Sequence, residues 1–139
     1  MTISMLIGYD LDGVLCDKPP KRDKPYNRQK KAEREAYAAE LLRHYTTAAV
    51  RFVPQGRFVI VSGRSARYRS EIEAWVRRNG LSHCEGIYLN PKTRTRRNMV
   101  EHKINICRQL DVGLFYEDDP AIARQIERAG IPVMLVKES

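Results

Sequence analysis

The sequence predicts a single α/β domain with an open, mostly parallel sheet of five strands and helices on both faces. Five short apolar segments alternate with segments of helical periodicity along the 139 residues. No repeat and no interdomain linker divides the chain. Polar residues directly follow three of the apolar segments, where a parallel sheet binds its ligands. One domain over residues 1–139 is therefore expected.

The first strand is expected over residues 3–9. Residues 18–25 carry three prolines and several charges, which predicts a loop. Asn27 is the predicted N-cap of a helix over residues 28–45. The apolar stripe of this helix would consist of Ala32, Tyr37, Ala38, Leu41, Leu42 and Tyr45.

The second and third strands are expected over residues 57–61 and 86–89. Between them, Ser65 is the predicted cap of a helix that ends at Asn79 and Gly80. The apolar residues of this helix at positions i, i+3 and i+4 are Ile72, Trp75 and Val76.

A basic loop follows the third strand, and residues 97–110 then show helical periodicity. The fourth strand is expected over residues 112–116. Pro120 suits the first turn of the next helix, which stops before Gly130. Residues 133–136 complete the predicted sheet. The apolar positions of the helix over residues 97–110 are Val100, Ile104, Cys107 and Leu110.

The composition suits a compact protein outside membranes. Hydrophobic residues make up 42% of the chain and charged residues 30%, which favours a packed core over disorder. No apolar run approaches the roughly 20 residues of a membrane span. Residues 3–7 are too short for the apolar core of a signal peptide. We therefore expect a cytoplasmic protein.

The three cysteines give no sign of a metal site or a disulfide. Cys16, Cys84 and Cys107 lack metal-type spacing, and an odd number argues against a disulfide framework. A nucleophilic thiol at Cys16 is an alternative that the sequence leaves open.

The net charge is +8, and the basic residues gather in two segments. A solvated surface explains either segment alone. Two basic segments that flank one site favour a polyanionic ligand, such as nucleic acid or a nucleotide. The first segment could equally contact another protein. The residues are Lys18, Lys21, Arg22, Lys24, Arg28, Lys30, Lys31 and Arg34 in the first segment, and Lys92, Arg94, Arg96 and Arg97 in the second.

Asp10 and Asp12 follow the first predicted strand, Ser62 and Arg64 the second, and an acidic cluster at residues 117–119 the fourth. In an extended backbone residues i and i+2 point the same way, so the first two aspartates would face one spot. Two crowded carboxylates are costly unless a cation, a proton or a reaction needs them. Each group alone also fits a turn or a helix cap. Their joint occurrence at one edge of a parallel sheet predicts an active site.

The order of these motifs resembles the haloacid dehalogenase (HAD) superfamily of phosphohydrolases over almost the whole chain. Asp-Leu-Asp-Gly-Val at residues 10–14 matches the first motif of that family. Val-Ile-Val-Ser-Gly-Arg at residues 59–64 resembles the second, a strand that ends in Ser or Thr. Lys103 stands where the third-motif lysine opens the helix before strand four, and residues 117–119 resemble the fourth motif. The resemblance implies a Rossmann-like HAD domain.

The resemblance also implies a mechanism. Asp10 would attack phosphorus and form an aspartyl-phosphate. Asp12 would protonate the leaving oxygen and then deprotonate the attacking water, a contribution of roughly 10²–10⁴ in rate. Lys103 and the Ser62 hydroxyl would neutralise and orient the phosphoryl oxygens.

Mg²⁺ is the implied cofactor, because it prefers oxygen ligands. Asp10, the backbone carbonyl of Asp12, and Asp118 would hold it. The positions of Pro120 and Gly130 favour Asp118 within the acidic cluster. Glu117 and Asp119 would orient the ligands, unless Asp119 is simply the helix cap.

The substrate is predicted from what the chain lacks. The gaps between the motifs leave no room for the cap domain with which larger family members enclose small substrates, and an open site accepts the end of a macromolecule. Ser-Gly-Arg followed by Arg67, Tyr68 and Trp75 resembles, more loosely, the 3′-phosphatase domain of bacteriophage polynucleotide kinase. The expected substrate is therefore a phosphorylated nucleic-acid end (3′-phosphate) or a nucleotide. Its expected contacts are Gly63, Arg64, Arg94, Arg96 and Arg97.

Two alternatives stay open. One is a small-molecule phosphatase for a nucleotide or sugar phosphate, with a lid supplied by a homodimer partner. The other is a non-catalytic, phosphate-binding regulatory module, since fold alone does not secure activity.

Overall fold

A computed structural model describes residues 5–20 and 27–137. Five parallel strands form one sheet in the order β3-β2-β1-β4-β5. The predicted α/β class is confirmed, and every strand pair is parallel. No inserted cap is present within residues 27–137. The elements are β1 (Ile7–Tyr9), α1 (Lys31–Thr47), β2 (Phe58–Ser65), a 3₁₀ turn (Ala66–Tyr68), α2 (Arg69–Arg78), β3 (Cys84–Asn90), α3 (Arg96–Gln109), β4 (Leu114–Glu117), α4 (Pro120–Arg128) and β5 (Val133–Leu135).

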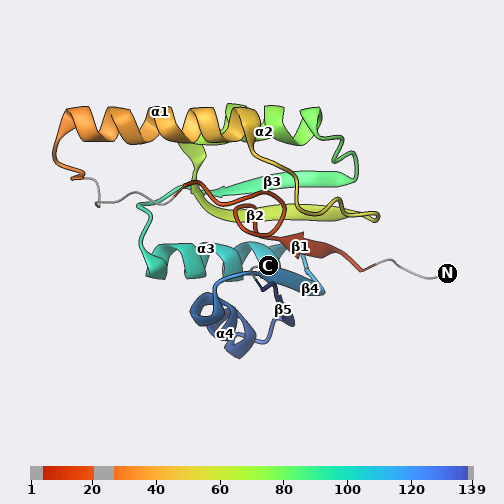
Figure 1. Cartoon of the computed structure of the whole chain (residues 1–139). Coiled ribbons are helices and arrows are strands. Elements are labelled where there is room, and N and C mark those ends of the chain that lie inside the picture. The colour runs from red at the N-terminus through yellow and green to blue at the C-terminus, as the bar shows by residue number, and fades with distance from the viewer. Residues whose placement is uncertain (1–4, 21–26, 138–139) are drawn as a thin grey trace.

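The molecule has three layers (Figure 1): α1 and α2 cover one face of the sheet, and α3 and α4 cover the other. Successive side chains of β2 point to opposite faces of the sheet, so β2 contributes to the core on both sides. Phe58 and Ile60 face the α1/α2 side, where they join Leu41, Ile72 and Trp75. On the opposite side the buried residues include Val59, Val61, Val100, Phe115 and Ile126.

The helix ends follow local hydrogen bonding. The Ser65 side chain accepts a hydrogen bond from the Arg67 amide, as its predicted capping role requires. Thr95 caps α3 in the same way, by accepting from the Asn98 amide at 3.1 Å. Gly80 has a φ of +68°, which suits the predicted stop after α2.

The predicted start of α1 is wrong. The Asn27 side chain accepts from the Gln29 amide in a turn that precedes the helix, and α1 begins at Lys31 without a side-chain cap. Two residues of the predicted apolar stripe, Ala32 and Leu42, are exposed. The first strand was also placed too broadly, since β1 begins at Ile7, and residues 3 and 4 lie outside the described part.

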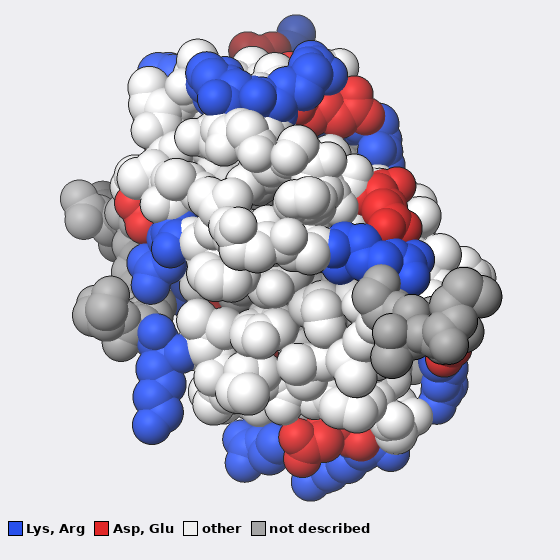
Figure 2. Space-filling view, turned by 90° about the vertical axis from the view of Figure 1, so that its right-hand side faces the viewer, with Lys and Arg blue, Asp and Glu red and all other residues white. Residues whose placement is uncertain are grey.

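The two edges of the sheet differ in character. The carboxyl ends of the strands gather the acidic and basic motifs. The opposite edge, where the strands begin, has a largely uncharged centre with charged side chains of both signs around it (Figure 2). Met5, Phe52 and Val53 are exposed hydrophobic residues before β1 and β2. Among the described residues no helix is both long and apolar enough to cross a membrane.

Candidate functional site

A tight turn after β1 brings Asp10 and Asp12 to the carboxyl edge of the sheet. The Leu11 carbonyl accepts hydrogen bonds from the amides of residues 14, 15 and 16 at 2.9–3.2 Å. Gly13 has a φ of +84°, and a Cβ there would collide with the Asp118 carboxylate. The expectation that an extended strand aligns the two aspartates is therefore wrong: β1 ends at Tyr9, and the turn aligns them.

A cavity of about 390 Å³ at this edge collects most of the predicted site residues. Arg96 and Arg97 do not line it; both are exposed at the start of α3, and Arg97 pairs with Glu101 at 3.2 Å. The predicted residues that line the cavity are Asp10, Asp12, Ser62, Gly63, Arg64, Arg94, Lys103, Glu117, Asp118 and Asp119.

Asp10 faces a buried lysine. Its Oδ1 accepts from the Leu11 amide at 2.8 Å, and its Oδ2 lies 3.5 Å from the Lys103 Nζ. Lys103 also donates to Glu117 Oε1 at 2.6 Å, and all three side chains are buried. Lys103 lies within α3 rather than at its start, on the side that faces the sheet.

Burial dominates the ionisation of this group. Burial raises the pKa of Asp10 well above its usual range, the Lys103 ammonium lowers it, and Glu117, Asp118 and Asp12 raise it further. Burial alone would lower the pKa of Lys103, but Asp10 and Glu117 reverse this effect and raise it. Lys103 therefore stays charged. Its single positive charge does not balance the carboxylates that surround Asp10.

The three residues of the acidic cluster, 117–119, have different roles. Glu117 Oε2 accepts from the amides of Asp118 and Asp119 at 3.0 and 3.2 Å, so Glu117 fixes the backbone of the cluster. Asp119 caps α4 by accepting from the amides of Ala121 and Ile122. Asp118 remains directed toward the cavity, where its Oδ2 pairs with Lys18 Nζ at 2.9 Å.

The carboxylates of Asp10, Glu117 and Asp118 suit a hard divalent cation. One oxygen from each lies within 4.8 Å of the other two. The raised pKa of Asp10 fits a site that needs a cation, and oxygen donors are the ligands that Mg²⁺ prefers. The Asp12 carboxylate does not belong to this group, so only its backbone carbonyl remains a predicted ligand.

Asp12 is held by a separate network. Arg64 donates to Asp12 Oδ2 from Nε at 3.2 Å and from Nη2 at 2.9 Å. The Tyr45 hydroxyl lies 2.9 and 3.0 Å from the two carboxylate oxygens, and Arg64 Nη1 donates to the Tyr37 hydroxyl at 3.0 Å. Arg64 is only 4% exposed. Although it lines the cavity, its guanidinium engages Asp12 rather than standing free for a phosphate.

Ser62 and Gly63 lie within β2, which runs to Ser65, so the predicted end of the second strand at residue 61 is wrong; both residues line the cavity. The Ser62 Oγ accepts from the Arg64 amide at 3.0 Å, and Ser62 is 1% exposed. Its hydroxyl hydrogen is therefore free to point toward a bound phosphoryl oxygen.

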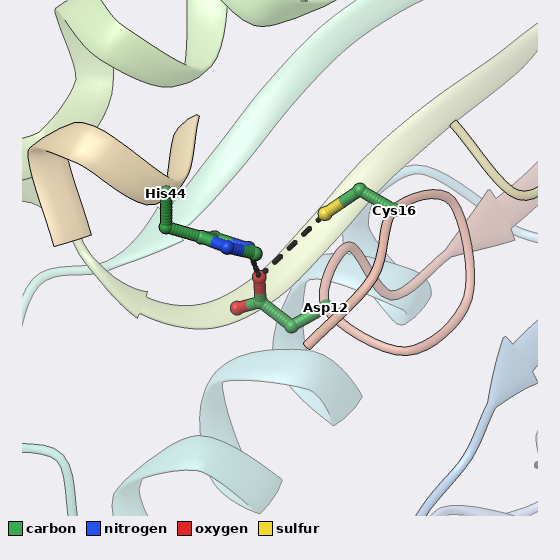
Figure 3. Close-up of side chains that lie close together, drawn as sticks. All are labelled: Asp12, Cys16 and His44. Carbon is green, nitrogen blue, oxygen red and sulfur yellow. Dashed lines mark hydrogen bonds and ion pairs between the residues drawn. The ribbon is translucent and has the colours of Figure 1, made fainter. Parts of the chain in front are cut away.

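Sequence reasoning missed several groups that shape the site. Tyr37 and Tyr45 were predicted only as apolar helix residues, and Lys18 only as part of a basic loop. The thiol of Cys16 lies 3.7 Å from Asp12 Oδ1 (Figure 3). Cys16 is fully buried, and burial, followed by the nearby Asp12 charge, raises the pKa of this thiol far above its usual range, which argues against a thiolate nucleophile.

No protein-family model and no curated protein matches this sequence. Several solved structures match over nearly the whole chain, including the three that follow. A HAD-superfamily hydrolase (subfamily IA, variant 1) from Geobacter sulfurreducens is 15% identical, with a TM-score of 0.60, and the match covers 94% of this chain and 88% of that one. A haloacid dehalogenase-like hydrolase from Streptococcus pneumoniae is 14% identical, with a TM-score of 0.57 and coverages of 94% and 83%.

The third match is a chain of the Pnkp1/Rnl/Hen1 RNA repair complex. It is 15% identical, with a TM-score of 0.60, and the match covers 97% of this chain but only 43% of that one. At these identities the matches show the fold, which is that of the HAD superfamily, as the motifs predict.

Proposed function

We propose that this protein is a Mg²⁺-dependent phosphomonoester hydrolase that acts through an aspartyl-phosphate on Asp10. One observation carries the proposal: Asp10 faces Lys103 and an acidic cluster in one cavity, while Asp12, two residues later, is held in a network of its own. A nucleophile and a proton-transfer group need such different surroundings. The HAD-like fold supports the same class of reaction.

In the first step an Asp10 oxygen forms a bond to phosphorus and the bond to the leaving oxygen breaks. Asp12 gives its proton to that oxygen. In the second step Asp12 takes a proton from water, the water oxygen bonds to phosphorus, and the Asp10–phosphorus bond breaks. Lys103 and Ser62 bind the phosphoryl oxygens throughout. Bound by Asp10 and Asp118, Mg²⁺ would neutralise the charge between the carboxylates and the phosphate.

The substrate class follows from a second hollow that adjoins the first. This hollow, of about 340 Å³, shares Tyr37, Arg64 and Arg94 with the catalytic cavity. Among the residues that the structure describes, no acidic side chain lines it. Its remaining basic residues are Arg28, Arg34, Arg67 and Lys92.

These basic residues differ from other arginines of the molecule. Arg57, Arg69 and Arg97 each pair with a glutamate at 2.8–3.5 Å. Within the described residues no such acidic partner is found for Arg67, Lys92 or Arg94. Cations left uncompensated beside a phosphatase cavity favour a substrate with further phosphates, such as a nucleic-acid end or a nucleotide.

The test is Mg²⁺-dependent phosphate release from 3′- and 5′-phosphorylated oligonucleotides, a mononucleotide panel and an aryl phosphate. We expect turnover concentrated on one oligonucleotide end. In Arg67→Ala and Lys92→Ala, KM should rise, and the log–log slope of the salt dependence should weaken by about 0.7–0.9 for each phosphate that the variant no longer neutralises. The matched control is Arg57→Ala, whose arginine lies at the start of β2 and pairs with Glu85.

Other outcomes would redirect the proposal. Turnover confined to mononucleotides or the aryl phosphate would keep the reaction and reject the nucleic-acid substrate. That result would favour a small-molecule phosphatase whose lid is supplied by a homodimer partner. A measurement of the oligomeric state would then test this alternative. Absence of turnover with Mg²⁺ bound would favour a regulatory module.

A further inference from the structure

A second cluster of metal-ligating side chains lies beside the acidic group of Asp10. It consists of Asp12 and Cys16, from the turn after β1, and His44, from the last turn of α1 (Figure 3). Asp12 Oδ1 lies 3.7 Å from Cys16 Sγ and 3.9 Å from His44 Nε2. The three ligand atoms lie within 4.8 Å of one another.

The histidine of this cluster lacks a hydrogen-bond partner. His44 is 9% exposed, and its Nε2 forms no hydrogen bond in the described structure, although it points at the Asp12 carboxylate (Figure 3). Buried polar nitrogens nearly always have a partner, and an exception indicates a bound water or ion. Because a carboxylate and a thiol complete the group, an ion is the better fit.

The donor types select the ion. A thiolate and an imidazole suit a borderline or soft cation such as Zn²⁺ and are poor ligands for Mg²⁺. Tetrahedral zinc with bonds of about 2.0–2.3 Å separates its ligand atoms by roughly 3.3–3.6 Å. The two contacts of Asp12 Oδ1, at 3.7 and 3.9 Å, need only a small contraction, and the Cys16 and His44 ligand atoms, which lie within 4.8 Å of each other, would also move closer.

The side chains around the cluster are compatible with a bound cation. Arg64 binds the Asp12 carboxylate through Oδ2, and the Tyr45 hydroxyl lies 2.9 Å from Oδ1 and 3.0 Å from Oδ2. Oδ1 is the oxygen that faces Cys16 and His44. Asp12 also lines the cavity described above, so the cluster adjoins that cavity. Cys16 would lose its proton to solvent as the zinc–sulfur bond forms, because a coordinating thiol is deprotonated by the metal.

We propose that Asp12, Cys16 and His44 form a Zn²⁺ site, and that Zn²⁺ bound there inhibits the protein by occupying the Asp12 carboxylate. The inhibitory part rests on the proposed function, in which Asp12 transfers protons. The binding part does not, since it depends only on the three ligands. Zinc would thus act at a site separate from the Mg²⁺ ligands Asp10 and Asp118.

The experiment uses the full chain, freed of metals by a chelator, with saturating Mg²⁺ present. Co²⁺ is the spectroscopic probe, because a cobalt–thiolate bond gives a charge-transfer absorption, and Zn²⁺ is then titrated against it. We expect one Co²⁺ per chain with this absorption, and full displacement by one equivalent of Zn²⁺. Cys16→Ser should abolish the absorption, and His44→Gln should weaken binding at least about 10-fold.

Cys107→Ser is the matched control, since Cys107 is also buried but lies in α3. It should bind as the parent does. Circular dichroism checks that each variant folds. If Cys16→Ser does not fold, His44→Gln tests the site in its place. Absence of the absorption in the parent, or its persistence in Cys16→Ser, would overturn the site and leave a water as the partner of His44. Loss of binding in Asp10→Asn but not in Cys16→Ser would instead place zinc on the Mg²⁺ ligands and also overturn it.

The inhibitory part is tested in the phosphate-release assay. Zn²⁺ at the concentration that fills the cobalt site should lower turnover at saturating Mg²⁺, and His44→Gln should shift the inhibition to at least about 10-fold more zinc. Full turnover with the site occupied would overturn the inhibition. A protein without turnover that still shows the cobalt–thiolate absorption would refute the proposed function and keep the zinc site, so the two failures are distinguishable.

Discussion

Asp10 and Asp12 line one cavity but have different surroundings. Asp10 is approached by a lysine and two further carboxylates. Asp12 is held by an arginine, a tyrosine hydroxyl, a thiol and an imidazole. Under the proposed function, the first arrangement would bind a hard cation and offer an oxygen to phosphorus, whereas the second fixes a carboxylate in place. Two identical side chains thereby acquire different chemistry from their neighbours.

The largest effect is expected from Asp10→Asn. The amide cannot attack phosphorus, so phosphate release should fall at least roughly 10⁴-fold. Phosphate release from the preferred substrate is the measurement, with ³²P trapping on the parent to detect the covalent intermediate. Retention of a tenth of the activity would show that Asp10 is not the nucleophile.

Asp12→Asn should be less severe and different in kind. Loss of proton transfer should lower kcat by roughly 10²–10⁴-fold for substrates with poor leaving groups. An aryl phosphate with an acidic phenol needs less help, so its first step should suffer less. An equal loss for both substrates would argue against Asp12 as the acid.

Arg64→Lys sharpens the contrast between the two halves of the site. Lysine keeps the charge but cannot donate from two positions to Asp12 and a third to Tyr37. The loss of a charged hydrogen bond, about 1.5–3 kcal/mol, should lower kcat about 10-fold or more while KM changes little. A rise in KM with unchanged kcat would instead support the predicted contact between Arg64 and the substrate.

The smallest effect concerns stability and pH. Because the folded state raises the pKa of Asp10, its carboxyl keeps a proton that the unfolded chain has already lost, so stability falls as pH rises toward that higher pKa. Mg²⁺ binds the charged carboxylate and should offset this loss, by about 2.7 kcal/mol at 100 times Kd. The rise in Tm on adding Mg²⁺ should therefore be larger at pH 8 than at pH 5. Asp10→Asn should largely remove that difference, and an unchanged difference would contradict the assignment.

Much of the fold follows from local patterns in the sequence. The apolar run within residues 57–61 predicted β2, which is buried on both faces, and the Ile72, Trp75 and Val76 spacing predicted α2, which buries one face. The start of α1 was misplaced because Asn27 accepts a local hydrogen bond in a turn, and capping residues serve turns equally well.

The site was predictable only in part. Asp10, Asp12 and Asp118 follow strands, whereas Ser62 lies within β2 and Lys103 within α3. The parallel sheet brings all five motif residues to one cavity. The hydrogen bond from Tyr45 to Asp12 spans 33 residues and has no local signature. Nor do the positions of Cys16 and His44 resemble metal-binding spacing, because two distant segments of the chain bring them together.

The central place of β1 has a consequence for folding. Tyr9 is paired with Ile60 on one side and Tyr116 on the other, so the first strand has neither neighbour until distant parts of the chain have arrived. Contacts between residues so far apart in sequence form slowly, because the intervening loops must close first. Asp10 and Asp118, which follow β1 and β4, come together only when these two strands pair. Recovery of activity after dilution from denaturant should therefore coincide with the last cooperative phase of refolding.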